Sequence, residues 1–243
     1  MRVTRVYVDA PLTTGSRVTL QGAAASHVTR VLRLRVGEAL TVFNGSGGEY
    51  AASIEHARGG TVAVAIGEAR AIERESPLTL TLAQGVSRGE RMDLVVQKAT
   101  ELGVSGLLPL LAERSVVRLT AQQVERRLNH WRAIAIAACE QSGRNRLPAI
   151  AAPVPLKDFL RGNSDGSMRL LLSPGATATL ADVPRLVTAV TVLIGPEGGL
   201  AEAEQEAAVA AGFTPVRLGP RVLRTETAAI AALTLLQREF GDL

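Results

Sequence analysis

Two glycine-containing turns carry the residues of this sequence whose types and spacing best suit chemistry. The first is "LIGPEGGL" at 193–200, where Glu197 stands between a proline and two glycines. The second is "LGPRVLRTETAAIAAL" at 218–233, which sets Arg224, Thr225 and Glu226 in a row. A carboxylate can accept a proton, and a guanidinium can stabilise negative charge that develops during a reaction. The two turns are therefore the first candidates for a functional site.

Each turn follows a short aliphatic run of the kind that forms a buried strand, the first ending at Ile194 and the second at Leu218. Ligands of open α/β sheets bind beyond the carboxyl ends of the strands, so we expect the turns to form two walls of one pocket. Taken singly, the glycines are explained as turn residues with positive φ. Together they also leave backbone N–H and C=O groups open to a small ligand. These glycines are Gly195, Gly198, Gly199 and Gly219.

The start of the last helical pattern has a structural interpretation as well as a chemical one. Thr225 is expected to be the N-cap of this helix, and Glu226 is well placed for the helix dipole. This leaves Arg224 unexplained, because the dipole opposes a cation at a helix N-terminus. We therefore expect Arg224 to have another task.

A third cluster, "EQSGRNRLP" at 140–148, is rich in hydrogen-bond donors. From Arg114 to Arg146 the sequence has seven arginines and two acids, which is typical of a surface that contacts phosphate or RNA. Arginines flank a second predicted helix end in the same way in "TRVLRLRVGE" at 29–38. A solvated helix end is the alternative in both places. The candidate RNA-binding residues are Arg30, Arg33, Gln141, Arg144, Asn145 and Arg146.

The composition limits the class of protein. A chain of 243 residues with 47% hydrophobic content can bury a core. Of the 27 basic residues two are lysines, and the arginine excess suits phosphate recognition, although a genomic bias toward arginine and alanine codons explains it equally well. The single cysteine, Cys139, excludes an internal disulfide and a cysteine-based zinc site.

Several familiar motifs are missing from the sequence. It has no G-x-G-x-x-G after a predicted strand and no G-x-x-x-x-G-K-[ST], which argues against a Rossmann dinucleotide site and a P-loop. The three histidines, His27, His56 and His130, are too dispersed for an H-E-x-x-H metal site. The N-terminus lacks the apolar segment of a signal peptide, and no apolar run is long enough to span a membrane. We expect a soluble cytoplasmic protein without a metal.

The first part of the chain reads as closely spaced short strands with one helix. The helix, around 23–34, is expected to place Ala24, Val28, Val31 and Leu32 on one face. A small β-barrel over residues 1–70 is the simplest model, and the charged segment from 67 to Pro77 is the best linker. The expected strands are Arg2–Val8, Arg17–Leu20, Ala39–Phe43, Glu49–Glu55 and Thr61–Ile66.

From residue 74 to 243 strands alternate with helices, which is typical of an α/β domain with a parallel sheet. Helices are expected over 91–102, after a capping box of Thr120 and Gln123, and over 225–240. The last helix is apolar on most sides, and a homodimer interface would bury its outer face. The expected strands are 78–84, 106–111, 168–173, 189–195 and 214–219.

Five motifs in this order and spacing resemble the ribosomal RNA small subunit methyltransferase E family. They are "HVTRVLRLRVGE" at 27–38, "KATELGV" at 98–104, "EQSGRNRLP" and the two glycine-containing turns. The resemblance covers nearly the whole chain. It implies an RNA-binding PUA-like β-barrel, residues 1–70, followed by a SPOUT methyltransferase domain, residues 74–243, which is an α/β fold with a C-terminal trefoil knot. Nothing in the periodicity of the sequence indicates the knot.

The resemblance also implies an activity. By this resemblance the protein is expected to transfer a methyl group from S-adenosylmethionine to N3 of a uridine in 16S ribosomal RNA. It is also expected to be a homodimer that acts on the small ribosomal subunit without a metal. Carried over by motif, the expected cofactor-binding residues are Leu172, Ser173, Ile194, Gly195, Gly199, Leu218, Gly219, Val222, Leu223 and Arg224.

Methylation at N3 requires loss of the hydrogen on that nitrogen, so a base or a stabilised uridine anion is needed. Glu197 and Glu226 are the candidate bases, and Arg224 is the candidate that stabilises the anion. The sequence leaves open which carboxylate acts. Two other functions stay open as well: a non-catalytic protein that binds RNA or assists ribosome assembly, and a 2′-O-ribose methyltransferase of the same superfamily.

Overall fold

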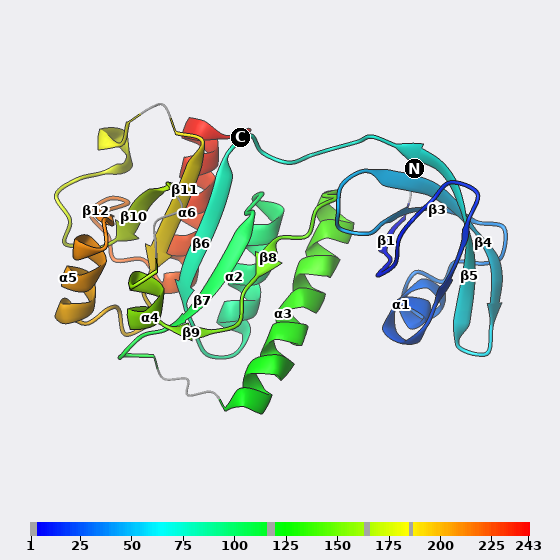
Figure 1. Cartoon of the computed structure of the whole chain (residues 1–243), viewed down its shortest axis with the longest axis horizontal. Coiled ribbons are helices and arrows are strands. Elements are labelled where there is room, and N and C mark those ends of the chain that lie inside the picture. The colour runs from blue at the N-terminus through cyan, green and yellow to red at the C-terminus, as the bar shows by residue number, and fades with distance from the viewer. Residues whose placement is uncertain (1–3, 116–119, 163–165, 185–186) are drawn as a thin grey trace. The chain divides into compact units, whose positions relative to one another are not determined.

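The computed structural model describes residues 4–115, 120–162, 166–184 and 187–243 (Figure 1). By its internal contacts the chain divides into two compact units. The first unit comprises Met1–Glu75 and Cys139–Leu147, and the second comprises Ser76–Ala138 and Pro148–Leu243. The arginine-rich segment 139–147 therefore packs with the first unit, although the residues on either side of it belong to the second.

The first unit is a curled five-stranded sheet with one helical segment, in the strand order β1-β3-β4-β5-β2. Strand β1 runs parallel to β3, and the other pairs are antiparallel. Register shifts between β4 and β5 increase the local twist, which helps the sheet to curl around its apolar core. The strands are β1 Arg5–Tyr7, β2 Arg17–Leu20, β3 Ala39–Phe43, β4 Glu49–Arg58 and β5 Thr61–Arg70.

Strand β5 continues to Arg70, into the segment predicted as a linker. The predicted first strand began at Arg2, but residues 1–3 lie outside the described part of the chain.

The predicted buried face of the helix in the first unit is confirmed for Ala24, Val28 and Leu32, which pack against the core, but it is wrong for Val31. Helix α1, Gly22–Ser26, continues as a π-helical turn over His27–Val31, in which the Leu32 N–H donates to the His27 carbonyl at 2.9 Å. The wider turn rotates the following side chains relative to an α-helix. Val28 is buried as predicted, but Val31 is 67% exposed.

The second unit has a parallel sheet in the order β12-β10-β11-β6-β7-β8, with β9 also paired to β7. The five strands predicted here are all present, but the last, predicted over 214–219, ends at Val216. The two-residue strands β8 and β9 are too short to show a sequence period. The strands are β6 Thr79–Gly85, β7 Gly106–Leu111, β8 Ala149–Ile150, β9 Val154–Pro155, β10 Met168–Leu172, β11 Ala189–Ile194 and β12 Thr214–Val216.

Alternate residues of these strands enter two apolar cores, one on each face of the sheet. Leu82 and Val192 pack into the core that contains residues of α2 and α6, whereas Ala83 and Leu193 pack into the core on the side of α4 and α5 (Figure 1). The helices are α2 Glu90–Glu101, α3 Ala121–Ser142, α4 Leu156–Leu160, α5 Glu202–Ala210 and α6 Thr225–Phe240, with a 3₁₀ turn over Leu180–Asp182.

The predicted helix boundaries rest on recognisable local signals. The Thr120 N–H donates to Gln123 Oε1 at 2.9 Å and the Gln123 N–H to Thr120 Oγ1 at 3.4 Å, which confirms the capping box before α3. Helix α2 ends before Gly103, whose φ of +80° is readily adopted by glycine. Within the part of the chain that the structure describes, no helix is both long enough and apolar enough to cross a membrane.

Candidate functional site

One cavity of about 740 Å³ lies where β10, β11 and β12 end, and both glycine-containing turns line it. Because parallel strands end at the same edge of a sheet, the expected walls come together although they are separated in sequence. All ten residues predicted to bind the cofactor line this cavity, as do the three candidate catalytic residues, of which Arg224 is also one of the ten.

The first wall, residues 195–200, is a turn that depends on its glycines. The Gly199 N–H donates to the Pro196 carbonyl at 2.8 Å, and Gly199 has a φ of +68°. A Cβ on Gly195 would lie 3.1 Å from the Gly199 carbonyl carbon, which is a crowded distance. On the neighbouring strand, a Cβ on Gly85 would overlap the backbone nitrogen of Pro196. The turn therefore sits directly on the end of β6.

Glu197 is held by hydrogen bonds on this turn. Its Oε1 accepts the Arg88 N–H at 3.0 Å and Arg91 Nη1 at 3.1 Å. Burial acts to raise the pKa of the Glu197 carboxyl, but hydrogen bonds from its own N–H, the Arg88 N–H and Arg91 outweigh burial and lower this pKa. A carboxylate with a lowered pKa is a weaker base, so these contacts favour a bracing role.

The second wall leads into α6, and its predicted cap is wrong. Arg224, with an extended ψ of 151°, is the N-cap of α6, and Thr225 is the first helical residue. The Thr225 Oγ1 does not cap the helix but donates to the Gly195 carbonyl at 2.7 Å. Tertiary contact with the other wall thus replaces the local cap that the sequence suggested.

Glu226 follows in the first turn of α6 and differs from Glu197. It is 9% exposed and lines the cavity. Its Oε2 is buried and has no hydrogen-bond partner among the described residues. Of the two candidate bases, Glu226 is therefore the one whose carboxylate is left without such bonds.

A third segment reaches the cavity from β10 and α5. Ser173 Oγ donates to Gln205 Oε1 at 3.2 Å, and Gln205 Nε2 donates to the Leu200 carbonyl at 3.2 Å. Gln205 thus joins the predicted Ser173 to the first wall. Sequence reasoning missed Gln205, because nothing near it in the chain indicates this bridge.

The cavity lining also contains arginines that sequence reasoning missed. Arg91 and Arg114 follow β6 and β7, and Arg114 Nη1 lies 3.4 Å from the Gly198 carbonyl oxygen. Arg217 and Arg221 are exposed and make no ion pair with any described residue. The rule that ligands bind beyond strand ends could have identified Arg91 and Arg114, since β6 and β7 end at the same edge.

The candidate RNA-binding residues belong to the first unit and fall into two groups. Arg144 is 3% exposed and its Nη2 pairs with Glu75 Oε2 at 2.5 Å, while the buried Asn145 donates to the Ile72 carbonyl at 2.6 Å. Arg146 pairs with Glu73 at 2.5 Å. Arg30, Arg33 and Gln141 are exposed.

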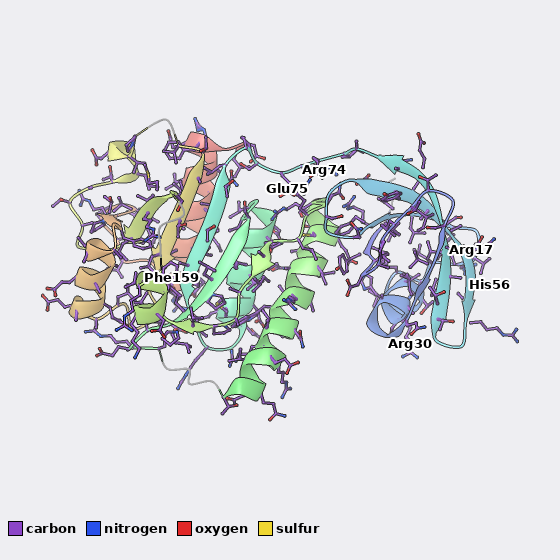
Figure 2. The ribbon with its side chains drawn as sticks, in the orientation of Figure 1. Arg17, Arg30, His56, Arg74, Glu75 and Phe159 are labelled. Carbon is purple, nitrogen blue, oxygen red and sulfur yellow. The ribbon has the colours of Figure 1, made fainter. Side chains whose placement is uncertain are left out.

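The segment after β5 supplies the carboxylates that hold this loop. Arg74 and Glu75 lie on that segment (Figure 2), and Arg74 Nη1 donates to the Gly143 carbonyl at 2.9 Å. Arg5 pairs with Glu49, and Glu49 also accepts from Asn145 at 3.3 Å. These contacts give Arg144 and Asn145 a structural part in the first unit, and RNA contact by them stays a prediction.

Among the described residues, no group of three or more His, Cys, Asp and Glu side chains could hold a metal ion.

Known protein families match both parts of the chain. An RNA methyltransferase domain family matches residues 74–237, and an RNA methyltransferase PUA domain family matches residues 20–66. A ribosomal RNA small subunit methyltransferase E of Buchnera aphidicola subsp. Schizaphis graminum is 34% identical over 242 residues, covering 100% of this chain and 98% of the relative. The protein of that name from Synechocystis sp. is 35% identical over 224 residues, covering 89% and 71%.

The chain belongs to the ribosomal RNA small subunit methyltransferase E family. Its predicted family and its fold, a PUA-like sheet domain followed by an α/β methyltransferase domain, are confirmed, and it is an RNA methyltransferase. The family member from Neisseria gonorrhoeae, solved with bound S-adenosyl methionine, has a TM-score of 0.92 at 36% identity and full coverage of both chains. A Legionella pneumophila methyltransferase structure with bound SAM has a TM-score of 0.97 at 43% identity, again with full coverage.

Proposed function

We propose that this protein transfers a methyl group from S-adenosylmethionine to N3 of a uridine in 16S ribosomal RNA. The observation that carries the proposal is the cavity in which two glycine turns meet Arg224 and Glu226 at the start of α6. Membership of the ribosomal RNA small subunit methyltransferase E family supports it independently.

The cavity fits a ligand of this kind. Its volume of about 740 Å³ lies within the range of sites for small molecules. A Cβ on Gly199 or Gly219 would meet no protein atom within 4 Å, so the lining has open space beside both backbones. The residues that would hold the cofactor are Leu172, Ser173, Ile194, Gly195, Gly199, Leu218, Gly219, Val222, Leu223 and Arg224. Bound S-adenosylmethionine supplies an activated methyl group on a sulfonium.

Glu226 is the better candidate for the base. Methyl transfer would form a bond from N3 to the methyl carbon and break the bond from that carbon to the sulfonium sulfur, which leaves as a neutral thioether. The N3–H bond breaks as well, so one proton must leave the uracil. Glu226 lines the cavity with a buried, unpartnered Oε2, whereas Glu197 already accepts from Arg88 and Arg91. We assign acceptance of the N3 proton to Glu226 and bracing of the first wall to Glu197.

Arg224 is suited to stabilise the uridine anion. It is exposed, lines the cavity and makes no ion pair with a described residue. Loss of the N3 proton spreads negative charge onto the two uracil carbonyl oxygens, and a guanidinium can donate to such oxygens. Its place at the N-cap of α6 sets it two residues from Glu226.

The proposal also includes the partners expected from the sequence. The first unit, with exposed Arg30 and Arg33, is the proposed RNA-binding domain. Val222 and Leu235 are large apolar side chains that are 80% and 42% exposed, which supports a homodimer that covers them. A cytoplasmic location, a C-terminal knot and action on the small ribosomal subunit complete the proposal.

Calorimetry and methyl transfer test this function. We expect titration with S-adenosylmethionine to show binding, and we expect transfer of labelled methyl to small subunits that lack it. Glu226→Gln should bind the cofactor but lose at least about a hundredfold in kcat, and Glu197→Gln should lose mainly cofactor affinity. Absence of both binding and transfer would leave a non-catalytic RNA-binding protein as the better explanation.

A further inference from the structure

A buried hydrogen-bond chain connects the two walls of the cavity through a residue that does not line it. Gln84, at the end of β6, is 0% exposed and is paired in register with Ile194 of β11. Its Nε2 donates to Thr225 Oγ1 at 2.8 Å and to the Gly85 carbonyl at 3.1 Å. Thr225 Oγ1 donates in turn to the Gly195 carbonyl at 2.7 Å. The chain therefore runs from the sheet to α6 and on to the first wall.

The direction of these bonds follows from the donors available. The Thr225 hydroxyl has one hydrogen, and the Gly195 carbonyl can accept but not donate. The hydroxyl hydrogen is therefore used on Gly195, and the remaining contact of Thr225 Oγ1 needs a donor. The amide NH₂ of Gln84 supplies it, which a glutamate or an apolar side chain of similar size could not do.

The hydrogen bonds from Gln84 matter for function because of where Thr225 lies. Thr225 lies between Arg224 and Glu226, and it is the residue that contacts the opposite wall at Gly195. The end of β6 supports that same wall a second time, because Gly85 lets Pro196 approach its backbone directly. One buried side chain, that of Gln84, therefore links the segment of Arg224 and Glu226 to the turn that would hold the methyl donor.

The energetic cost of burying Gln84 also supports a role for its amide as a donor. Its Oε1 is buried and has no partner among the described residues, and an apolar residue of the same shape would avoid that unsatisfied acceptor. The site keeps a residue that is unfavourable in part, and the retained half of the amide is the donor to Thr225.

We propose that Gln84 is a positioning residue for methyl transfer, acting through Thr225 to set the spacing between the first wall and the pair Arg224 and Glu226. This inference rests on the proposed function. The juxtaposition that carries it is the bond chain from Gln84 to Thr225 to the Gly195 carbonyl.

The protein offers a matched control residue, Gln237, near the other end of α6. Gln237 is also 0% exposed, donates to the Leu102 carbonyl at 2.8 Å and accepts from Ser76 Oγ at 2.7 Å. Both glutamines tie α6 to its surroundings, but Gln237 does not line the cavity, and neither do its two partners. Gln84→Met and Gln237→Met therefore remove comparable buried hydrogen bonds at different distances from the proposed chemistry.

The test compares these two variants with the unsubstituted protein. We expect Gln84→Met to raise the Kd for S-adenosylmethionine about tenfold and to lower kcat about a hundredfold at saturating cofactor, because small misplacements of reacting groups are costly. Gln237→Met should lower Tm about as much as Gln84→Met does. It should leave Kd and kcat within about twofold of the unsubstituted protein, since its hydrogen bonds lie outside the site. Equal losses in both variants, or unchanged constants in a folded Gln84→Met, would overturn the proposal.

Hydrogen exchange in the absence of cofactor separates this inference from the proposed function. Amides of 195–200 and 224–228 should exchange faster in Gln84→Met than in Gln237→Met, even if no methyl acceptor is found. If Gln84→Met fails to fold, Thr225→Val and Thr225→Ser test the same chain. The serine keeps the hydroxyl and should retain protection and cofactor affinity, whereas the valine should lose both. Wild-type protection at 195–200 in Thr225→Val would contradict the inference.

Discussion

In the first unit, two arginines whose side chains are largely buried pair with carboxylates. Arg144 is buried against Glu75, and Arg5 is buried against Glu49. At the cavity of the second unit Arg91 pairs with Glu197, but three other exposed arginines make no ion pair with any residue that the structure describes; they are Arg217, Arg221 and Arg224. A guanidinium bound to a carboxylate has fewer donors left for a phosphate or a uracil oxygen, and an unpaired one at a cavity has all of them.

The difference shows that the arginine excess has no single explanation. An arginine-rich stretch predicts the presence of charge, but the surrounding carboxylates decide whether that charge stabilises the fold or remains available to a ligand. Glu73 and Glu75 lie more than sixty residues before the loop they hold, so local sequence could not reveal the pairing. This division between paired and unpaired arginines can be tested by substitution.

The largest effect is expected from Arg224 in the second unit. Arg224→Met should reduce kcat about a hundredfold to a thousandfold, because it would remove the donor proposed to stabilise the uridine anion. Single-turnover methyl transfer at saturating cofactor measures this loss. Arg238→Met, an exposed arginine in the last turn of the same helix, is the control and should keep the wild-type rate. A wild-type kcat in Arg224→Met would remove Arg224 from the mechanism.

In the first unit, the expected effect of losing an arginine is on stability. Arg144→Met should lower the free energy of unfolding of the first unit by about 2–3 kcal/mol. The Arg144 side chain is 4% exposed, and its loss leaves the Glu75 carboxylate without its buried partner. Arg146→Met removes a neighbouring pair with Glu73, but those side chains are 54% and 38% exposed, so it should cost less than about 1 kcal/mol.

The measurement must report on the first unit. The single tryptophan, Trp131, lies in the second unit, so hydrogen exchange of β3 and β4 is the better probe. Equal destabilisation by Arg144→Met and Arg146→Met would contradict the distinction between buried and exposed pairs.

Two carboxyls of the first unit should give opposite pH dependence. Burial acts to raise the pKa of Glu49, but Arg5, Asn145 and Arg74 outweigh it and lower this pKa below its ordinary value of 4.5. Its contribution to stability is present above pH 4.5 and is lost as the pH falls through the lowered pKa. Glu49→Gln should therefore destabilise the unit at pH 7, with a difference from wild type that shrinks in acid.

The pKa of Glu140 is shifted in the opposite direction from that of Glu49. Burial raises its pKa above 4.5, and the Tyr7 N–H and His27 offset only part of the shift. Its contribution is full below pH 4.5 and is lost as the pH rises through the raised pKa. Glu140→Gln should thus stabilise the unit at pH 7 and match wild type near pH 4. Unfolding of both variants between pH 3 and pH 8 checks the two signs. A stability change of the same sign in both variants at pH 7 would contradict the opposite pKa directions of Glu49 and Glu140.

The smallest effect is expected at the exposed arginines of the first unit. Neutralising Arg30 and Arg33 together should weaken RNA binding and reduce the slope of log K against log salt by about 0.7 for each lost phosphate contact. Arg17, also exposed but paired with Glu55 at 2.6 Å, is the control (Figure 2). Binding of a small-subunit RNA fragment at several salt concentrations gives the slopes. A slope that is unchanged in the Arg30 and Arg33 variant, or equally reduced in Arg17→Gln, would assign these residues to other roles.

Much of the fold could be predicted because its signals are local. Glycine at 103, the capping box at 120 and the aliphatic strands each act over a few residues, and the structure agrees with them. Val31 was predicted on the wrong face because a π-helical turn changes the period within one helix. Strands β8 and β9 were missed because two residues have no period.

The site could be predicted where it depends on glycine turns, and not where it depends on distant partners. The turns that contain Gly199 and Gly219 line the same cavity, as strand ends in one sheet should. Glu197 meets Arg88 and Arg91 from more than a hundred residues away, and Thr225 meets Gln84 over a similar separation. Such pairings arise from the order of strands in the sheet, which the sequence pattern does not encode.

Identification of the product nucleoside tests the central claim most directly. Small ribosomal subunits that lack the methyl group would be incubated with the protein and S-adenosylmethionine, and the digested RNA would be analysed by mass spectrometry. The account predicts a base-methylated uridine with the methyl on N3, formed by the wild-type protein and strongly reduced in Glu226→Gln. A methyl group on the ribose 2′ oxygen, or no new methylated nucleoside, would contradict it.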